Sequence, residues 1–158
     1  MTVALAADVL EACRAAGLTV ATAESCTGGL VCAALTDVPG SSAVVERGFV
    51  TYANIAKTQM LGVDAALIAA HGAVSAEVAR AMVEGALAAS TADLAVAVTG
   101  VAGPGASEAK PEGLVFFAAA RRGGDVIVER RNFGPLGRAR VRSASVDVAL
   151  EILLRLAR

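Results

Sequence analysis

The sequence has few aromatic side chains and few groups that exchange protons near neutral pH. Its 158 residues include no tryptophan, one tyrosine (Tyr52), one histidine (His71) and three cysteines. One histidine and scattered cysteines cannot form a zinc site, so we predict neither a metal nor a cofactor. His71 precedes a glycine at a predicted helix end, where it suits interaction with the last carbonyls better than a Ser-His-Asp triad. An odd number of cysteines argues against a disulfide framework. Because a disulfide framework is not expected, we expect the protein in the cytoplasm.

The sequence also lacks a charge excess and long apolar runs. Lysine and arginine total 14 against 15 acidic residues, so the net charge is −1 and a general nucleic-acid surface is not expected. No apolar run approaches the roughly 20 residues of a membrane span, and the N-terminus lacks the basic segment of a signal peptide. Hydrophobic residues make up 56%. We therefore predict one folded domain over residues 1–158, with enough exposed apolar surface to form a homo-oligomer.

Helix and strand patterns alternate along the chain, and a hairpin at Gly123-Gly124 closes the series. The predicted helices cover residues 3–16, 30–36, 54–61, 64–70, 76–90 and 138–157. The predicted strands cover residues 18–23, 48–52, 94–98, 114–120 and 126–133. This order predicts an α/β fold, a three-layer α/β/α sandwich whose mixed sheet is mostly parallel with one antiparallel strand.

Ser25 stands where the first strand turns on two glycines and a helix begins. Free backbone N–H groups at a helix start carry partial positive charge, so such a turn binds a phosphate or the oxyanion of an acyl-transfer step. We predict Ser25 as a nucleophile, with the N–H groups of Thr27 to Gly29 holding the oxyanion. The candidate oxyanion and substrate-binding residues of this turn are Cys26, Thr27, Gly28 and Gly29.

Lys57 is the best candidate for the base that takes the Ser25 proton. The chain has only two lysines, Lys57 and Lys110, among many arginines. Unlike an arginine, a lysine loses its proton when its surroundings disfavour the charge. With Asn54 as the predicted N-cap, Lys57 falls in the first turn of its helix, where the dipole opposes a positive charge. Tyr52 could orient Lys57 or relay its proton. The alternative is a solvated lysine and an ordinary strand tyrosine.

A second glycine-rich turn follows another buried strand and contains Thr99, Gly100 and Gly103. Parallel strands collect ligand loops at their C-terminal ends, so this turn should lie beside the serine turn. Arg138 and Arg142 lie one helical turn apart at the start of the last helix and could clamp a phosphate or carboxylate. A solvated basic face is the alternative for these two arginines.

Several of these motifs, taken together and in order, resemble the CinA C-terminal domain family, whose stand-alone members are nicotinamide-nucleotide amidohydrolases. The matching stretches are Ala-Glu-Ser-Cys-Thr-Gly-Gly (23–29), Phe-Val-Thr-Tyr-Ala-Asn-Ile-Ala-Lys (49–57), Leu-Gly-Val (61–63), His-Gly-Ala-Val-Ser (71–75), Thr-Gly-Val-Ala-Gly-Pro (99–104) and Lys-Pro-Glu-Gly (110–113). They cover nearly the whole chain. The loop over residues 103–113 looks one residue shorter than is usual in the family.

The resemblance implies hydrolysis of the carboxamide of nicotinamide mononucleotide to nicotinate mononucleotide and ammonia, which serves pyridine-nucleotide recycling. It further implies a metal-independent mechanism in which Ser25 and Lys57 form a Ser-Lys dyad, and a five-stranded mixed sheet. Two other classes of function stay open. One is a non-catalytic nucleotide-binding regulatory module of the competence/damage-inducible type. The other is a phosphate-transfer enzyme that uses the glycine turns and requires a metal.

Overall fold

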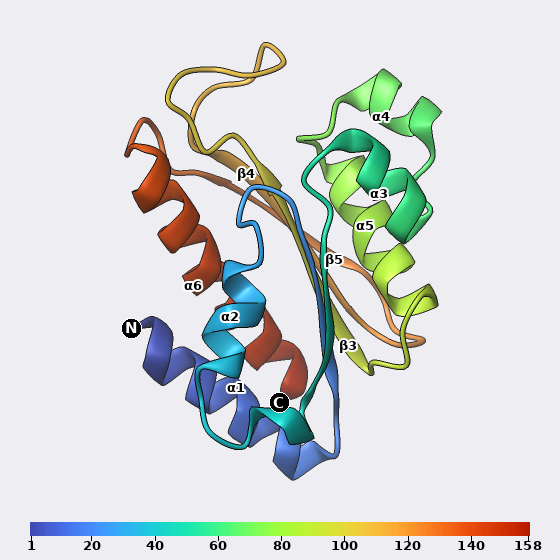
Figure 1. Cartoon of the computed structure of the whole chain (residues 1–158), viewed down its shortest axis with the longest axis vertical. Helices are drawn as coiled ribbons and strands as arrows, with labels where there is room; N and C mark the ends of the chain where they lie inside the picture. The colour runs from blue at the N-terminus through green and yellow to red at the C-terminus, as the bar shows by residue number, and fades with distance from the viewer.

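One mixed sheet forms the centre of the molecule, in a computed structural model that describes all 158 residues (Figure 1). Its five strands are ordered β2-β1-β3-β4-β5. β1 pairs in parallel with β2 and β3, whereas β4 is antiparallel to both β3 and β5. Four strands therefore run one way and β4 runs the other way. This confirms the predicted fold class, including the single reversed strand.

The element bounds follow the predicted alternation. The strands are β1 (Val20–Glu24), β2 (Val45–Val50), β3 (Leu94–Gly100), β4 (Leu114–Arg121) and β5 (Ile127–Asn132). The helices are α1 (Thr2–Ala16), α2 (Leu30–Thr36), α3 (Asn54–Leu61), α4 (Ala65–His71), α5 (Ala76–Ala88) and α6 (Arg138–Ala157), with a short 3-10 helix η1 (Ser41–Ala43). None of the helices combines the length and the apolar composition needed to cross a membrane.

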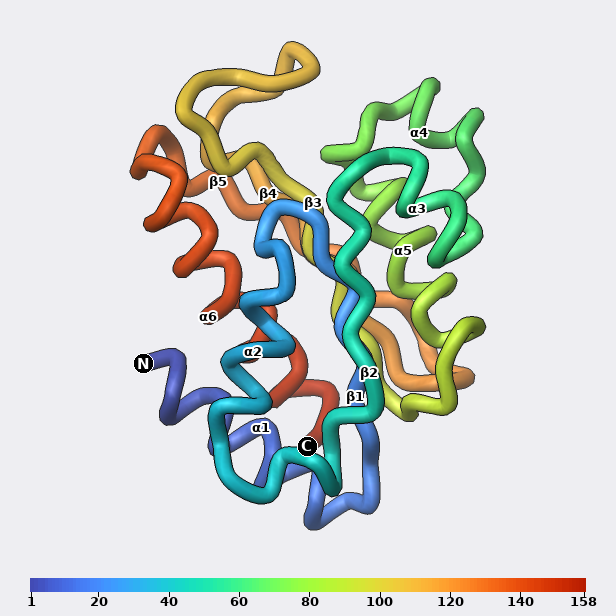
Figure 2. The backbone as a smooth tube through the Cα atoms, in the orientation of Figure 1, coloured from blue at the N-terminus to red at the C-terminus, as the bar shows by residue number.

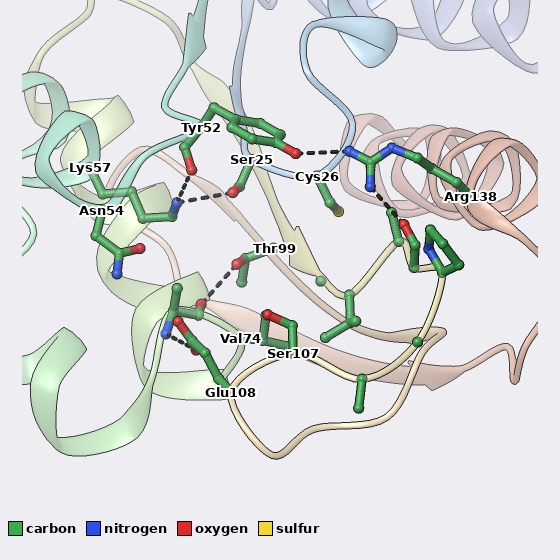
Figure 3. Close-up of a pocket in the computed structure, with 18 residues that line it drawn as sticks. Ser25, Cys26, Tyr52, Asn54, Lys57, Val74, Thr99, Ser107, Glu108 and Arg138 are labelled. Carbon is green, nitrogen blue, oxygen red and sulfur yellow. Dashed lines mark hydrogen bonds between the residues drawn. The ribbon is translucent and has the colours of Figure 1, made fainter.

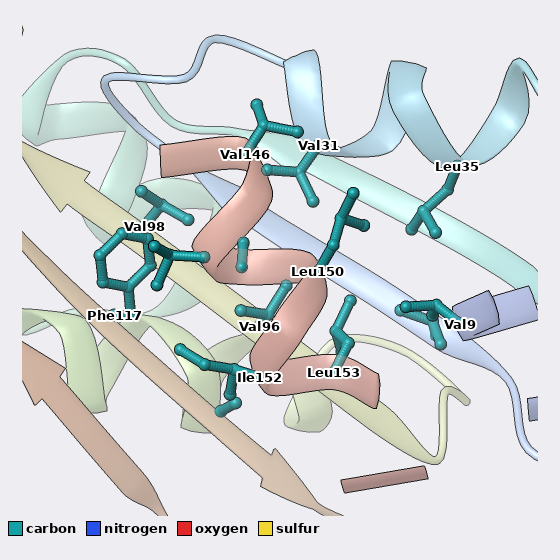
Figure 4. Packing of buried hydrophobic residues seen from close by; sticks show 14 of the residues in the cluster. Val9, Val31, Leu35, Val96, Val98, Phe117, Val146, Leu150, Ile152 and Leu153 are labelled. Carbon is teal, nitrogen blue, oxygen red and sulfur yellow. The ribbon is translucent and has the colours of Figure 1, made fainter. Parts of the chain in front are cut away.

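The two faces of the sheet bury side chains of different size. Successive strand residues point to opposite faces, and β3 alternates valine with alanine. Val96 and Val98 join a buried cluster of 25 residues with α1, α2 and α6 (Figure 4). Ala95 and Ala97 join a cluster of 16 residues beneath α3, α4 and α5. Burial on both faces explains why the central strands read as continuous apolar runs and why the fold has three layers.

β2 and the start of α3 differ from the sequence-based prediction. β2 begins at Val45 and ends at Val50, about three residues earlier at its start and two at its end than predicted. Its bounds follow from pairing with β1, and only Phe49 of this edge strand is buried, so its apolar pattern carries little information. The predicted N-cap role of Asn54 is wrong, because Ala53 is the N-cap and supplies no side-chain hydrogen bond.

The C-terminal ends of β1 and β3 meet at one edge of the sheet. Figure 2 shows the turn that follows β1 and the long loop that follows β3 leaving this edge, with α3 beside them. The Ser25 backbone N–H donates to the carbonyl of Val98, at 2.9 Å, which joins the two strand ends. The Thr51 N–H donates to the Glu24 carbonyl, at 2.8 Å, and ties the end of β2 to the same place.

Gly85 allows α5 to contact α3 closely, and we expect Gly85→Ala to destabilise the fold. A Cβ atom at position 85 would lie 1.9 Å from the Leu61 carbonyl oxygen. Alanine improves helix propensity by about 1 kcal/mol, but a clash with backbone outweighs this gain. Chemical denaturation should show a net loss of about 2 kcal/mol. The neighbouring exposed variant Glu84→Ala is the control and should stay within about 0.5 kcal/mol of wild type. Unchanged stability of Gly85→Ala would contradict this packing.

Candidate active site

Ser25 and Lys57 meet in a cavity of about 240 Å3 at the shared edge of the sheet (Figure 3). The Lys57 Nζ atom lies 2.9 Å from Ser25 Oγ. It also lies 2.8 Å from the carbonyl oxygen of Thr51 and 3.1 Å from that of Tyr52. Lys57 is 1% exposed and Ser25 is 9% exposed. The structure thus brings the predicted nucleophile and the predicted base within hydrogen-bond distance, and Lys57 is not a solvated surface lysine.

The surroundings of Lys57 favour its uncharged form. Burial lowers the pKa of its amine, while Cys26 and Glu108 act in the opposite direction to a smaller extent. Its position in the first turn of α3 adds the unfavourable dipole of that helix. A neutral amine has two N–H bonds and one lone pair. When the N–H bonds donate to the carbonyls of Thr51 and Tyr52, the lone pair remains for the proton of the Ser25 hydroxyl.

Glu24 holds the serine turn in place. Its side chain is fully buried at the N-terminus of α2, where the helix dipole favours a negative charge. Its carboxylate accepts hydrogen bonds from Thr27 Oγ1 at 2.7 Å, Val31 N at 2.8 Å and Cys32 N at 3.0 Å. These contacts fix the path of the chain on both sides of Ser25. Glu24 therefore acts as a structural anchor for the turn rather than as an acid in the cavity.

The structure places three of the predicted oxyanion residues away from the cavity. Thr27, Gly28 and Gly29 do not line it, and the N-terminus of α2 binds the Glu24 carboxylate instead. The Gly28 N–H donates to the Ser25 carbonyl at 3.0 Å. Cys26 does line the cavity, and its backbone N–H makes no hydrogen bond to another residue. Of the four predicted candidates, Cys26 is therefore the one whose main-chain donor lies at the cavity.

The Cys26 thiol does not compete with the Ser25 hydroxyl as a nucleophile. Burial raises the pKa of this thiol to about 12, so it stays protonated near neutral pH. Only the thiolate is strongly nucleophilic. The side chain of Cys26 therefore acts as a small packing group.

Tyr52 contacts Lys57 through its backbone and not through its side chain. The tyrosine is 60% exposed, and its hydroxyl accepts a hydrogen bond from Arg138 Nη2 at 2.8 Å. The carbonyl of Tyr52 contacts the amine, which agrees with an orienting role through the main chain, whereas the predicted proton relay is corrected because the hydroxyl does not reach Lys57. Figure 3 shows the ring directed away from Lys57 and toward Arg138.

The two predicted arginines have different places. Arg138 lines the cavity and donates from Nη1 to the Gly103 carbonyl at 2.7 Å. Arg142 lies outside it, beneath the serine turn, and donates to the carbonyls of Cys26 at 3.1 Å and Thr27 at 3.4 Å. The predicted clamp of two arginines is therefore wrong, since these main-chain oxygens already hold Arg142. One guanidinium remains for an anionic ligand.

The second glycine-rich turn forms the opposite wall, as its position after β3 predicted. Thr99, Gly100 and Gly103 all line the cavity. Thr99 is buried and its hydroxyl donates to the Ala73 carbonyl at 2.8 Å. His71 does not line the cavity, and its Nδ1 atom lies 3.7 Å from a carboxylate oxygen of Glu77. No group of three or more His, Cys, Asp or Glu side chains gathers where it could hold a metal ion.

Three polar side chains at the cavity were missed by the sequence analysis. They are Asn54, Ser107 and Glu108. We predicted Asn54 as a helix cap. Its position just before Lys57, in the first turn of the same helix, could also have suggested a place at the cavity. Ser107 and Glu108 lie on a loop with no strand or helix periodicity. Only the folding of that loop back over the sheet edge brings them to the cavity.

Comparisons with known proteins agree with this architecture. The protein CihA from Agrobacterium tumefaciens, described as competence/damage inducible, has a crystal structure that superposes with a TM-score of 0.96 at 49% identity, covering 99% of this chain and 96% of that one. Nicotinamide-nucleotide amidohydrolase PncC of Escherichia coli is 51% identical over 150 residues, which are 94% of this chain and 90% of PncC. A CinA-like protein of Mycolicibacterium gilvum is 55% identical over 141 residues, and the match spans only 33% of its length.

The likeness extends along the chain rather than to isolated motifs. The sequence profile of the CinA C-terminal domain matches residues 2–157. This confirms the resemblance found in the serine, lysine and glycine-rich motifs. The chain belongs to the CinA C-terminal domain family.

Proposed function

We propose that this protein is an amidohydrolase that converts nicotinamide mononucleotide to nicotinate mononucleotide and ammonia, using Ser25 and Lys57. The observation that carries the proposal is the buried Lys57 amine 2.9 Å from the Ser25 hydroxyl. The similarity to PncC, which is named a nicotinamide-nucleotide amidohydrolase, supports the substrate class. The match spans only about a third of the CinA-like protein, so the activity of such longer proteins gives no support for the activity of this chain.

In the first half of the reaction, neutral Lys57 accepts the Ser25 proton while Ser25 Oγ attacks the carboxamide carbon. The C=O double bond opens and its oxygen becomes negatively charged. The free N–H of Cys26 donates to this oxyanion, and a fixed donor in a buried site is a strong source of transition-state stabilisation. The protonated Lys57 then gives its proton to the amide nitrogen. The C–N bond breaks, ammonia leaves and the acyl group remains on Ser25 as an ester.

In the second half, water takes the place of ammonia. Lys57, neutral again, accepts a proton from the attacking water, and the oxyanion forms once more beside Cys26. Lys57 returns the proton to Ser25 Oγ as the ester bond breaks and the acid is released. The carbonyls of Thr51 and Tyr52 keep the amine directed at Ser25 throughout, because both hold it through the main chain.

Arg138 would bind the phosphate of the substrate. It is the guanidinium that lines the cavity, and its planar set of donors suits a phosphate. Its bonds to the Tyr52 hydroxyl and the Gly103 carbonyl hold it in position. Thr99 and Gly100, which also line the cavity, would contact the ribose.

We expect Ser25→Ala to abolish ammonia release while the protein keeps its fold and its ligand affinity. Removing a nucleophile that acts with its base as a unit lowers kcat by about 10^4-fold or more. Ammonia release from nicotinamide mononucleotide measures the activity, and calorimetry measures binding. Ser42→Ala, at an exposed site outside the cavity, is the control and should match wild type.

The same assay separates the alternative functions. Nucleotide binding by the wild-type protein without ammonia release would indicate a regulatory binding module. Loss of activity on adding a chelator would favour a metal-dependent phosphate-transfer enzyme. Full activity of Ser25→Ala would exclude the proposed mechanism.

The activity should depend on pH through Lys57. Only the neutral amine accepts the Ser25 proton, so kcat/KM should fall as pH drops through the pKa of Lys57 and level off above it. Because burial lowers this pKa, the plateau should begin below the usual lysine value of about 10.4. Lys57→Arg, which stays charged, should be inactive across the whole range. A profile that rises only above about pH 10 would contradict the lowered pKa of Lys57, and activity of Lys57→Arg would show that Lys57 is not the base.

Two further predictions accompany the proposal. Large apolar side chains are exposed around the end of β2 and the starts of α2 and α3, and they support the predicted homo-oligomer. They are Leu30, Val50, Tyr52 and Ile55.

A cytoplasmic location, where pyridine nucleotides are recycled, stays a prediction.

A further inference from the structure

Glu108 is a carboxylate in a cavity whose proposed chemistry does not use an acid. Three charged side chains line this cavity, namely Lys57, Arg138 and Glu108. The first two have roles in the mechanism above. The Glu108 Oε2 atom accepts a hydrogen bond from the Ala73 N–H at 3.1 Å, and its Oε1 atom has no partner within the protein. Figure 3 shows this side chain on the wall formed by the loop after β3.

The backbone at Glu108 adopts a conformation that L-residues with side chains disfavour. Glu108 has φ 52° and the following Ala109 has φ 60°. They are the central residues of a tight turn that is closed by two hydrogen bonds of 2.9 Å between Ser107 and Lys110. Glycine and asparagine are the usual residues at such positions. A glutamate kept there, with its side chain at a cavity, indicates that the carboxylate itself has a use.

The loop that carries Glu108 is fixed at its far end by Lys110. The Lys110 Nζ atom donates to the carbonyl of His71 at 2.7 Å and to that of Val74. These carbonyls flank Ala73, whose N–H holds the Glu108 carboxylate. The turn therefore presents its negative charge to the cavity at a defined position.

In the absence of a ligand, the charge of Glu108 opposes the proposed base. Glu108 raises the pKa of Lys57, whereas proton transfer from Ser25 needs the neutral amine. A positive charge that arrives with the substrate would remove this conflict, because it would neutralise the field of Glu108 and repel the proton on Lys57. In nicotinamide mononucleotide the pyridinium nitrogen carries a permanent positive charge, one ring carbon away from the carbon that bears the carboxamide.

We infer that Glu108 recognises the cationic ring and makes the enzyme selective for N-substituted pyridinium carboxamides over amides with an uncharged ring. This inference rests on the proposed function and names the feature of the substrate that the cavity reads. Arg138 and Glu108 then bind opposite charges of one ligand, the phosphate and the ring. An uncharged amide that fits the cavity by shape alone would make neither of these two charge contacts and would bind more weakly.

The test compares two ligands that share the carboxamide, ribose and phosphate. One is nicotinamide mononucleotide, and the other is its reduced form, whose dihydropyridine ring is uncharged. Calorimetry in the Ser25→Ala background measures both affinities without turnover. Adding Glu108→Gln keeps an oxygen for the Ala73 N–H but removes the charge. We expect it to weaken binding of the cationic ligand by at least about fivefold and to leave the neutral ligand within about twofold.

Two variants complete the experiment. Glu108→Asp keeps the charge and should retain the preference for the cationic ring. Glu77→Gln removes the same charge from an exposed site outside the cavity and should change neither affinity. An equal loss for both ligands in Glu108→Gln would show a structural role for this residue, and no loss for either would show no role. Each result would overturn the inference while ammonia release by the wild-type protein still supported the proposed function.

Discussion

The desolvation of one amine is the constraint on which the candidate site depends. Lys57 is 1% exposed, and its three polar neighbours are a hydroxyl and two main-chain carbonyls. No carboxylate forms an ion pair with it, and burial outweighs the opposing influence of Glu108 on its pKa. A buried amine without a counter-ion loses its proton more readily than one in water. The two carbonyls that accept from its N–H bonds direct the lone pair at Ser25.

The sheet supplies the rigidity that this arrangement needs. Ser25 follows a strand that is buried on both faces, and its N–H is bonded to the neighbouring strand. Lys57 comes from the helical layer that covers the alanine-rich face. Glu24 uses its charge within the protein to hold the start of α2, which leaves Cys26 as the turn residue with a free N–H at the cavity. The layer order thus brings the turn after β1, which carries the nucleophile and the donor, and α3, which carries the base, together at one edge.

Much of this arrangement could be predicted from the sequence because it depends on local features. The bounds of α6 agree with the prediction because the apolar spacing of this helix marks them. Ser25 and Lys57 stood out through turn composition and through the rarity of lysine. The directions of Tyr52 and Arg142 were not predictable, because each depends on contacts between distant segments. The Arg138–Tyr52 hydrogen bond spans 86 residues, and the bonds that hold Arg142 depend on how α6 packs beneath the serine turn.

The two carbonyls that hold Lys57 belong to residues five and six positions earlier in the chain. The orientation of the base is therefore a property of one short segment and of its length, and it is indifferent to which side chains stand at positions 51 and 52. Insertion of a single residue between Thr51 and Lys57 would have a different consequence. It would rotate the amine by about 100° around the axis of α3 and turn it away from Ser25.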